Sequence, residues 1–422
     1  NLFMFYRLNK IFNVSIAILL VNISFGQIKS LSKLNLKIDS LINKSIGEKV
    51  FPGAQVYIKI GAETIINKSF GHHTYDSLVK VENNHLYDLA SLTKVLASTI
   101  GIMKLQQDFG LNLNDPVSKY LPELKKSNKK YSSFIEVLSH TAGWMPYINH
   151  HYSLKRNNGK LKTSIVRNKQ SKRFNIKVSE DLFVRESYQK KMFKRIRKSE
   201  IRMPGEYLYS GLFFFYVPKL IEKITAQSYE DYLNNTFYQK INNNSIVFNP
   251  ENKSIVVPTE FDTFFRNSLI QGTVHDEAAS LFGGKSGNAG LFGSAEGIGN
   301  LIEIFENWNS KKIFNPFKES TINGFTSYAF PESNIRRGLG FDKPKKGDKD
   351  SYPNEKLSKQ SFGHTGFTGT FFWVDPEKKL SIVFLTNRVY PSRENEKLYD
   401  QNIRSKLIDI VFENSIINLE KI

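Results

Sequence analysis

Short β-rich runs lie at both ends of the chain, and this placement constrains the fold more than any other feature of the sequence. Near the start, residues 54–60 and 64–70 are two strand patterns joined by a turn that contains Gly61. Near the end, residues 370–374 and 380–385 form a second pair with a turn between them. If one more strand joins, the two pairs make a five-stranded antiparallel sheet.

Helical spacing of apolar residues accompanies each strand pair and fills the middle of the chain. It covers residues 32–46 and 395–414, and 91–310 is mainly helical with loops marked by Gly and Pro. The sequence therefore predicts an α+β fold: a five-stranded or larger antiparallel sheet from both chain ends, flanked by helices, with a mainly helical second region. We find no internal repeat and expect a single domain over residues 27–422.

The first 26 residues have the pattern of a secretory signal peptide. Arg7 and Lys10 form a short basic region, residues 11–21 form an apolar run, and Ser24 and Gly26 are the small residues that a signal peptidase reads. The apolar run is shorter than the roughly 20 residues that cross a bilayer, so we expect no transmembrane segment in the mature chain. The sequence thus predicts a periplasmic or secreted protein.

Composition excludes several kinds of chemistry. The chain has no cysteine, which excludes disulfides, thiol nucleophiles, iron–sulfur clusters and thiolate zinc sites. No H-E-x-x-H motif occurs and the eight histidines are scattered, so we expect no metal and no cofactor. With 13% aromatic and 23% charged residues, the sequence is not that of a disordered chain.

Most of the basic excess lies in one stretch. The chain has 59 Lys and Arg against 40 Asp and Glu, a net charge of +19. Residues 151–202 contain 17 basic and 4 acidic residues, which leaves +13 in this stretch alone. We interpret it as a basic insertion that is either a solvated surface or a site for an anionic cell-wall polymer. It lacks the spaced Gly and aromatic residues of RNA-recognition modules, so we expect no nucleic-acid partner.

A serine followed three residues later by a lysine is the strongest sign of catalysis. Ser91 and Lys94 open a segment with helical apolar spacing, 91–103, so their side chains share a helix face. A lysine in reach of a serine hydroxyl can take its proton and create a nucleophile. Only Ser91 follows an apolar run; the same spacing recurs among polar residues at Ser30, Ser77, Ser127 and Ser187.

Two further segments complete a possible site. Tyr209 lies on a loop before an apolar helix and could exchange protons with the lysine. His364, Thr365 and Gly366 open a β-rich run. The small-residue strand expected over 366–369 can run beside a substrate and offer backbone N–H groups to an oxyanion.

Together these motifs resemble the serine β-lactamase and penicillin-binding-protein superfamily, which includes class C β-lactamases, their esterase relatives and DD-carboxypeptidases with an H-T-G motif. The similarity runs from about residue 32 to 414. The stretches that carry it are LASLTK at 89–94, LSHTAG at 138–143, Tyr209-Ser210 and HTG at 364–366. A bacterial branch similar to the domain fused to β-N-acetylglucosaminidases is indicated by VHDE at 274–277, GNAGLF at 287–292 and LTNR at 385–388.

The resemblance implies a serine hydrolase that forms an acyl-enzyme. Ser91 would attack the substrate carbonyl, Lys94 and Tyr209 would handle its proton, and water activated by the same pair would release the product. Backbone N–H groups of Ser91 and Phe367 would form the oxyanion hole, and the H-T-G motif would bind a substrate carboxylate or polar group. The substrate-binding and oxyanion residues so implied are His364, Thr365, Gly366 and Phe367.

Two positions depart from the family pattern. Gly211 stands where the family's Y-x-N or Y-x-D motif has an amide or carboxylate that helps to hold the substrate amide, which argues against an efficient β-lactamase. Asn288 stands where the branch usually has His. His275 and Asp276 lie within a motif but have no assigned chemistry, and we expect them to make structural hydrogen bonds.

Three functions remain open. The leading prediction is an exported hydrolase that cleaves amide bonds in peptidoglycan-derived peptides, with a small molecule or a peptidoglycan fragment as substrate. The same residues support a promiscuous carboxylesterase. A catalytically silent, cell-wall-binding relative is mildly favoured by Gly211, Asn288 and the basic charge.

Overall fold

The structure is a computed structural model, and it describes residues 30–241, 244–345 and 352–414. The signal peptide predicted over residues 1–26 lies outside the described residues. Within the described ranges, no helix has both the length and the apolar character needed to cross a membrane.

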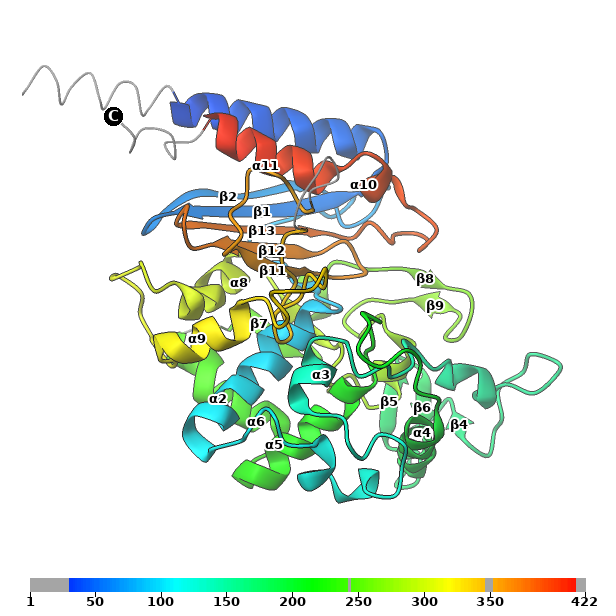
Figure 1. The fold of residues 1–422 in the computed structure, drawn as a ribbon. Helices are drawn as coiled ribbons and strands as arrows, with labels where there is room; N and C mark the ends of the chain where they lie inside the picture. Colours follow the sequence, from blue (N-terminus) through cyan, green and yellow to red (C-terminus); the bar gives the residue numbers. More distant parts are fainter. Residues whose placement is uncertain (1–29, 242–243, 346–351, 415–422) are drawn as a thin grey trace, which may run out of the picture.

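A five-stranded antiparallel sheet joins the two ends of the chain, which confirms the predicted fold class (Figure 1). Its order is β11-β12-β13-β1-β2. The register pairs Ala54 with Thr386 and Ile60 with Leu380. The fifth strand, which the sequence left open, is β11. The strands are β1 (Gly53–Ile60), β2 (Glu63–Gly71), β11 (Phe362–Thr365), β12 (Phe371–Asp375) and β13 (Leu380–Thr386).

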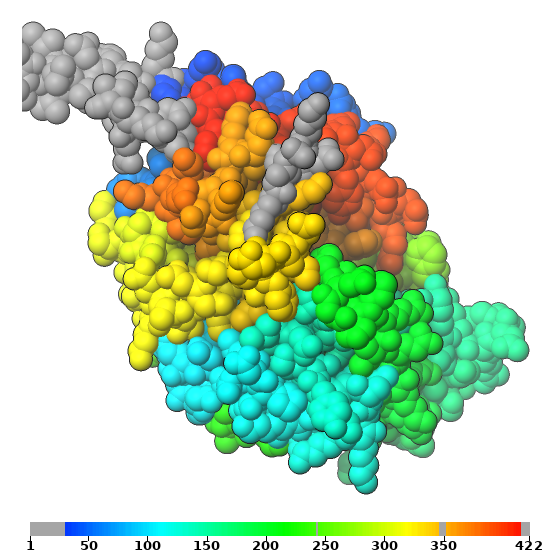
Figure 2. All heavy atoms as spheres, viewed as in Figure 1, coloured from blue at the N-terminus to red at the C-terminus, as the bar shows by residue number. Residues whose placement is uncertain are grey.

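Helices cover both faces of this sheet. The helix over residues 30–47 and α11 (Ile403–Asn414) lie together on one face, drawn in blue and red at the top of Figure 1. The other face is covered by α8 (Ala295–Ile302). This helix can approach β1 closely because residue 299 is glycine: a Cβ there would lie 2.3 Å from the Tyr57 ring. The space-filling view shows the first and last described segments, coloured blue and red, at one end of the molecule, and residues from 100 to about 230 at the other (Figure 2).

The helix predicted over 395–414 is two helices. The first, α10 (Lys397–Asp400), ends before α11 begins, and Asn402 between them has a left-handed backbone with a φ of 52°. A left-handed residue cannot continue a right-handed helix, and Asn tolerates this conformation better than most residues.

The remaining elements form the mainly helical region and three small sheets. The longer helices are α2 (Ile100–Phe109), α4 (Ser187–Lys198), α5 (Val217–Thr225) and α9 (Glu319–Thr326). The shorter α-helices are α3 (Phe134–Leu138), α6 (Tyr229–Leu233) and α7 (Glu277–Ser280). The 3-10 helices are η2 (Val117–Lys119), η3 (Pro122–Leu124), η4 (His150–Leu154), η5 (Phe213–Tyr216), η7 (Gln239–Ile241), η8 (Lys253–Ile255) and η9 (Glu303–Phe305), and the π-helices are η1 (Lys94–Thr99) and η6 (Asn234–Tyr238).

One small sheet, β3-β10-β7, contains the strand that precedes Ser91 in the sequence, β3. It consists of β3 (Tyr87–Asp88), β10 (Leu291–Gly293) and β7 (Ile246–Phe248). A two-stranded sheet pairs β8 (Phe261–Asp262) with β9 (Ser268–Leu269).

The basic stretch 151–202 is a folded part of the chain. It contains the sheet β4-β6-β5, made of β4 (Val166–Arg167), β6 (Leu182–Val184) and β5 (Ile176–Ser179), followed by α4. Met192 and Ile196 on α4 are fully buried in the main hydrophobic cluster. Other positions on the same helix are exposed: Lys190, Lys191, Lys194 and Lys198. Helix α4 therefore buries an apolar face in the core and exposes a basic face.

Candidate functional site

A cavity of about 430 Å³ lies where the small sheet, the Tyr209 loop and the turn after β11 meet. Four residues predicted for the site line it: Ser91, Lys94, Tyr209 and Phe367. Much of the remaining wall is aromatic, and it includes Tyr147, Tyr152, Phe215 and Phe264. The structure thus brings three separate segments of the chain to one cavity.

Lys94 and Ser91 are in direct contact. Lys94 Nζ donates a hydrogen bond to Ser91 Oγ at 2.9 Å and a second one to the backbone oxygen of Asn288 at 2.9 Å. The lysine is 3% exposed and begins the π-helix η1. Its Nζ lies 5.4 Å from the centre of the Tyr209 ring. A lysine side chain so placed can exchange a proton with the serine hydroxyl.

The backbone before Ser91 is strained and held in place by Asp88. Ala90 has a left-handed backbone with a φ of 46°, an unusual conformation for a residue with a side chain. Asp88 accepts a hydrogen bond from the Ala90 N–H at 2.8 Å and another from the His275 N–H at 2.6 Å. Sequence reasoning missed Asp88, because its role depends on a residue far along the chain.

The segment 366–369 is a turn between β11 and β12, so the prediction of a strand there is wrong. Gly369 has a φ of 102°, a conformation that a strand does not use. The turn still lies against the serine loop: a Cβ on Gly366 would lie 2.6 Å from Leu89 O, and Thr368 donates its hydroxyl to Asp88 O at 2.7 Å.

Two backbone N–H groups at the cavity lack a hydrogen-bond partner in the part of the chain that the structure describes. Among the described residues, neither the N–H of Ser91 nor that of Phe367 makes a hydrogen bond. Both belong to residues that line the cavity. Paired N–H groups of this kind can stabilise an oxyanion that develops on a substrate carbonyl.

The H-T-G residues lie behind the cavity wall. His364 is 3% exposed, and burial together with the nearby Arg337 lowers its pKa to about 3, so the ring is neutral. Its Nδ1 lies 2.7 Å from Thr365 O, and its ring centre lies 6.2 Å from that of Tyr209. Thr365 is partly exposed and Gly366 is buried. The contact of His364 and Thr365 with a substrate stays a prediction.

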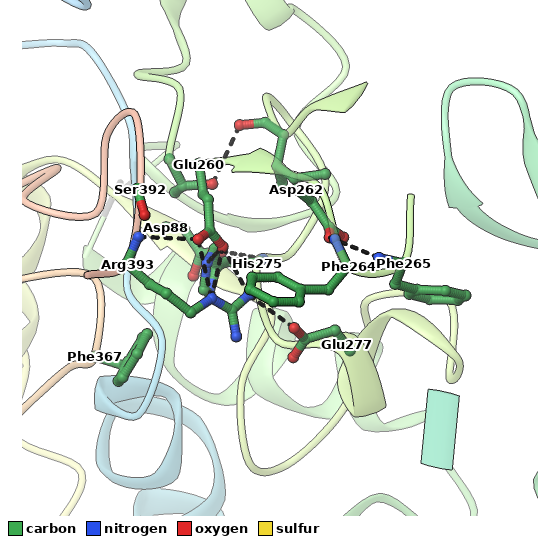
Figure 3. A network of polar contacts seen from close by, with 12 residues as sticks. Asp88, Glu260, Asp262, Phe264, Phe265, His275, Glu277, Phe367, Ser392 and Arg393 are labelled. Atoms are coloured by element: carbon green, nitrogen blue, oxygen red, sulfur yellow. Dashed lines mark hydrogen bonds and ion pairs between the residues drawn. The ribbon is translucent and has the colours of Figure 1, made fainter. Parts of the chain in front are cut away.

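A buried ionic network forms one end of the cavity (Figure 3). Glu260 pairs with His275 Nε2 at 2.7 Å and with Arg393 Nη2 at 2.6 Å, and Arg393 also contacts Glu277 at 2.8 Å. Burial opposes ionisation of Glu260, but its hydrogen bonds with His275 and Arg393 lower its pKa to about 2. Sequence reasoning missed Glu260 and Arg393, because no local pattern connects them.

His275 and Asp276 make the structural hydrogen bonds that we expected. His275 links Asp88 to Glu260 through its backbone and its ring. Asp276 accepts a hydrogen bond from the Ala279 N–H at 2.7 Å and caps α7. In the part of the chain that the structure describes, no cluster of three or more His, Asp or Glu side chains could hold a metal ion.

Comparisons with known proteins match this chain over most of its length. The Beta-lactamase family model matches residues 38–404. A protein of Salmonella enteritidis PT4 named "Putative D-alanyl-D-alanine carboxypeptidase" is 27% identical over 392 residues, which cover 86% of this chain and 84% of that protein.

Solved structures share the fold at low sequence identity. A class C beta lactamase has a TM-score of 0.64 at 16% identity, covering 91% of this chain and 98% of its own. EstCE1, a hydrolase with promiscuous acyltransferase activity, has a TM-score of 0.63 at 17% identity, with 90% and 99% covered. A penicillin-binding protein homolog from Caulobacter crescentus has a TM-score of 0.64 at 13% identity, with 91% and 97% covered.

Proposed function

Because this chain belongs to the beta-lactamase family and is a serine hydrolase, we propose that it cleaves amide bonds in peptidoglycan-derived peptides through an acyl-enzyme on Ser91. The observation that carries the proposal is the 2.9 Å hydrogen bond between Lys94 Nζ and Ser91 Oγ on the wall of a 430 Å³ cavity. The name of the Salmonella relative, which is matched over most of both chains, supports a peptide amide as the substrate.

The residues of the cavity support a two-step reaction. Ser91 Oγ attacks the carbonyl carbon while its proton passes to the Lys94–Tyr209 pair. The oxyanion accepts hydrogen bonds from the N–H groups of Ser91 and Phe367. The same proton is given to the leaving amine, and the C–N bond breaks. Water then attacks the acyl-enzyme, loses a proton to the pair and releases the acid with regeneration of Ser91.

Labelling with active-site reagents tests the proposal. The purified mature protein is incubated with a fluorophosphonate probe and, separately, with a fluorescent penicillin, beside Ser91→Ala. Ser187→Ala is a matched control, because Ser187 has the same spacing to Lys190 but lies exposed on α4. We expect labelling to disappear only in Ser91→Ala. No labelling of the folded wild-type protein by either reagent would refute the enzyme mechanism and favour the catalytically silent, cell-wall-binding alternative.

A carboxylesterase is the second candidate, favoured by the aromatic wall of the cavity. Such a wall suits an apolar acyl or alcohol group as well as a peptide. Muramyl peptides and D-alanyl-D-alanine peptides, assayed beside a panel of p-nitrophenyl esters, separate the two. Peptide turnover supports the amidase, whereas turnover of esters alone supports the esterase.

We further propose that the protein is exported after cleavage near residue 26 and that its basic face binds an anionic cell-wall polymer. The face consists of the exposed lysines of α4: Lys190, Lys191, Lys194 and Lys198. Fractionation and N-terminal sequencing of the expressed protein test export. Changing these four lysines to Glu should abolish co-sedimentation with purified cell wall, while the exposed pair Lys125 and Lys126 changed to Glu should not.

A further inference from the structure

The side chain of Asn288 presents an oriented donor to the cavity. Asn288 is 5% exposed, and it lines the cavity beside Lys94. Its Oδ1 accepts a hydrogen bond from Ser286 Oγ at 2.7 Å, which fixes the orientation of the amide. Among the described residues, its Nδ2 has no acceptor. Nδ2 is not among the buried polar atoms that lack a partner, so it remains accessible, and a substrate oxygen in the cavity can accept a hydrogen bond from it.

The backbone around Asn288 is held in place on both sides. A Cβ on Gly287 would lie 2.2 Å from Phe214 O, and Ser98 Oγ donates to Gly287 O at 2.8 Å. Gly290 has a φ of 122°, and a Cβ there would lie 1.9 Å from Gly284 O. Neither glycine can be exchanged without a backbone shift, so the position of Asn288 is set by close packing.

The space in front of Asn288 is open because residue 211 is glycine. A Cβ on Gly211 would lie 3.9 Å from Asn288 Cβ and 3.8 Å from Lys94 Cε, which are ordinary contacts. A side chain at 211 would therefore fit here, next to the lysine, and none is present. A polar group of the substrate can occupy this volume and meet the Asn288 amide.

We propose that Asn288 Nδ2 donates a hydrogen bond to a second carbonyl oxygen of the substrate, in the acyl group that is transferred to Ser91. The site then selects acylamino-acyl groups, as in a peptide, over plain acyl groups of the same size. This inference rests on the proposed function, because it concerns the acyl group that Ser91 receives.

Two esters of equal heavy-atom count and the same branching test this preference: p-nitrophenyl N-acetylalaninate, which has the second carbonyl, and p-nitrophenyl 2,4-dimethylpentanoate, in which a methyl group replaces the carbonyl oxygen and a methylene group replaces the N–H. For Asn288→Ala, we expect kcat/KM to fall about three- to tenfold on the first ester, as for loss of one neutral hydrogen bond, and to stay unchanged on the second. Asn114→Ala, at an exposed position outside the cavity, should change neither.

A rescue variant makes the test specific. Gly211→Asn in the Asn288→Ala background supplies an amide from the opposite side of the same volume and should restore the preference. Ser286→Ala removes the hydrogen bond that orients the Asn288 amide but keeps the amide itself. It should lower the ratio of kcat/KM for the first ester to that for the second about two- to threefold, and it replaces Asn288→Ala in the test if that variant does not fold. An equal effect on both esters, or no effect on either, would overturn the inference. If wild type turns over neither ester and Ser91 is not labelled, the proposed function fails and the inference with it.

Discussion

Replacing Gly366 by alanine tests whether the turn after β11 holds a backbone donor at the reacting carbonyl. The added Cβ would lie 2.0 Å from Thr370 Oγ1 and 2.6 Å from Leu89 O. The threonine side chain can rotate away, but the Leu89 carbonyl belongs to the backbone just before Ser91. That contact must open by about 0.4 Å to reach 3.0 Å, the separation below which a Cβ is not found. The turn that carries the Phe367 N–H must move away from Ser91 by a comparable distance.

The rate effect follows from what an oxyanion donor contributes. Loss of one donor lowers kcat by about 10²–10³-fold. A displaced donor keeps part of its hydrogen bond, so we expect the acylation of Ser91 to slow about ten- to hundredfold. The assay is the rate of fluorophosphonate labelling at a fixed temperature, with thermal unfolding measured in parallel. Gly324→Ala is the control, because a Cβ there meets nothing within 4 Å. A Gly366→Ala rate within twofold of wild type would refute the reasoning.

Three further changes test the supports of the site. Asp88→Ala leaves two backbone N–H groups without an acceptor and should lower the free energy of unfolding by about 2–5 kcal/mol in urea titrations; a loss below about 1 kcal/mol contradicts this role. The pKa of Glu260 is lower in the folded than in the unfolded protein, so its stabilisation is present above about pH 4.5 and is lost as the pH falls toward about 2. Glu260→Gln should therefore have a lower Tm than wild type at pH 7, and the difference in Tm should shrink between pH 5 and 2. A difference in Tm that stays constant over this pH range would contradict the stabilising role of the Glu260 carboxylate. Gly299→Ala should lower the free energy of unfolding by about 1–3 kcal/mol, because the added methyl group overpacks against Tyr57. A free energy of unfolding equal to that of Gly324→Ala in urea titrations would contradict this.

The strands of the sheet could be predicted where their pattern was long and regular. β1, β2, β12 and β13 follow their predicted ranges closely. β11 has only four residues, two of which are Gly363 and His364, so the sequence indicated a β-rich run from His364 onward but not a separate strand that ends at Thr365. The prediction of a strand over 366–369 is wrong because glycine permits both extended backbone and positive φ, and Gly369 adopts a φ of 102°, which local sequence does not specify.

The site also contains features that local sequence predicts and features that only tertiary packing determines. The contact of Lys94 with Ser91 follows from their spacing in the chain, which is a local property. The positions of Asp88, Glu260 and Asn288 depend on partners that tertiary packing brings to them. The lowered pKa of His364 likewise depends on its burial and on Arg337, which tertiary packing brings to within 3.5 Å of its ring, and could not be predicted from the H-T-G motif alone.

The pairing of β1 with β13 also determines when this protein can fold. Residue 54 pairs with residue 386, so the centre of the sheet cannot close until the chain through β13 has been synthesised. Contacts between residues so distant in sequence slow folding, because a very long loop must be ordered before the pairing stabilises it. A chain truncated before β12 would leave β1, which is buried along almost its entire length, paired only with β2. Such a fragment would expose an apolar strand edge and would be prone to aggregation.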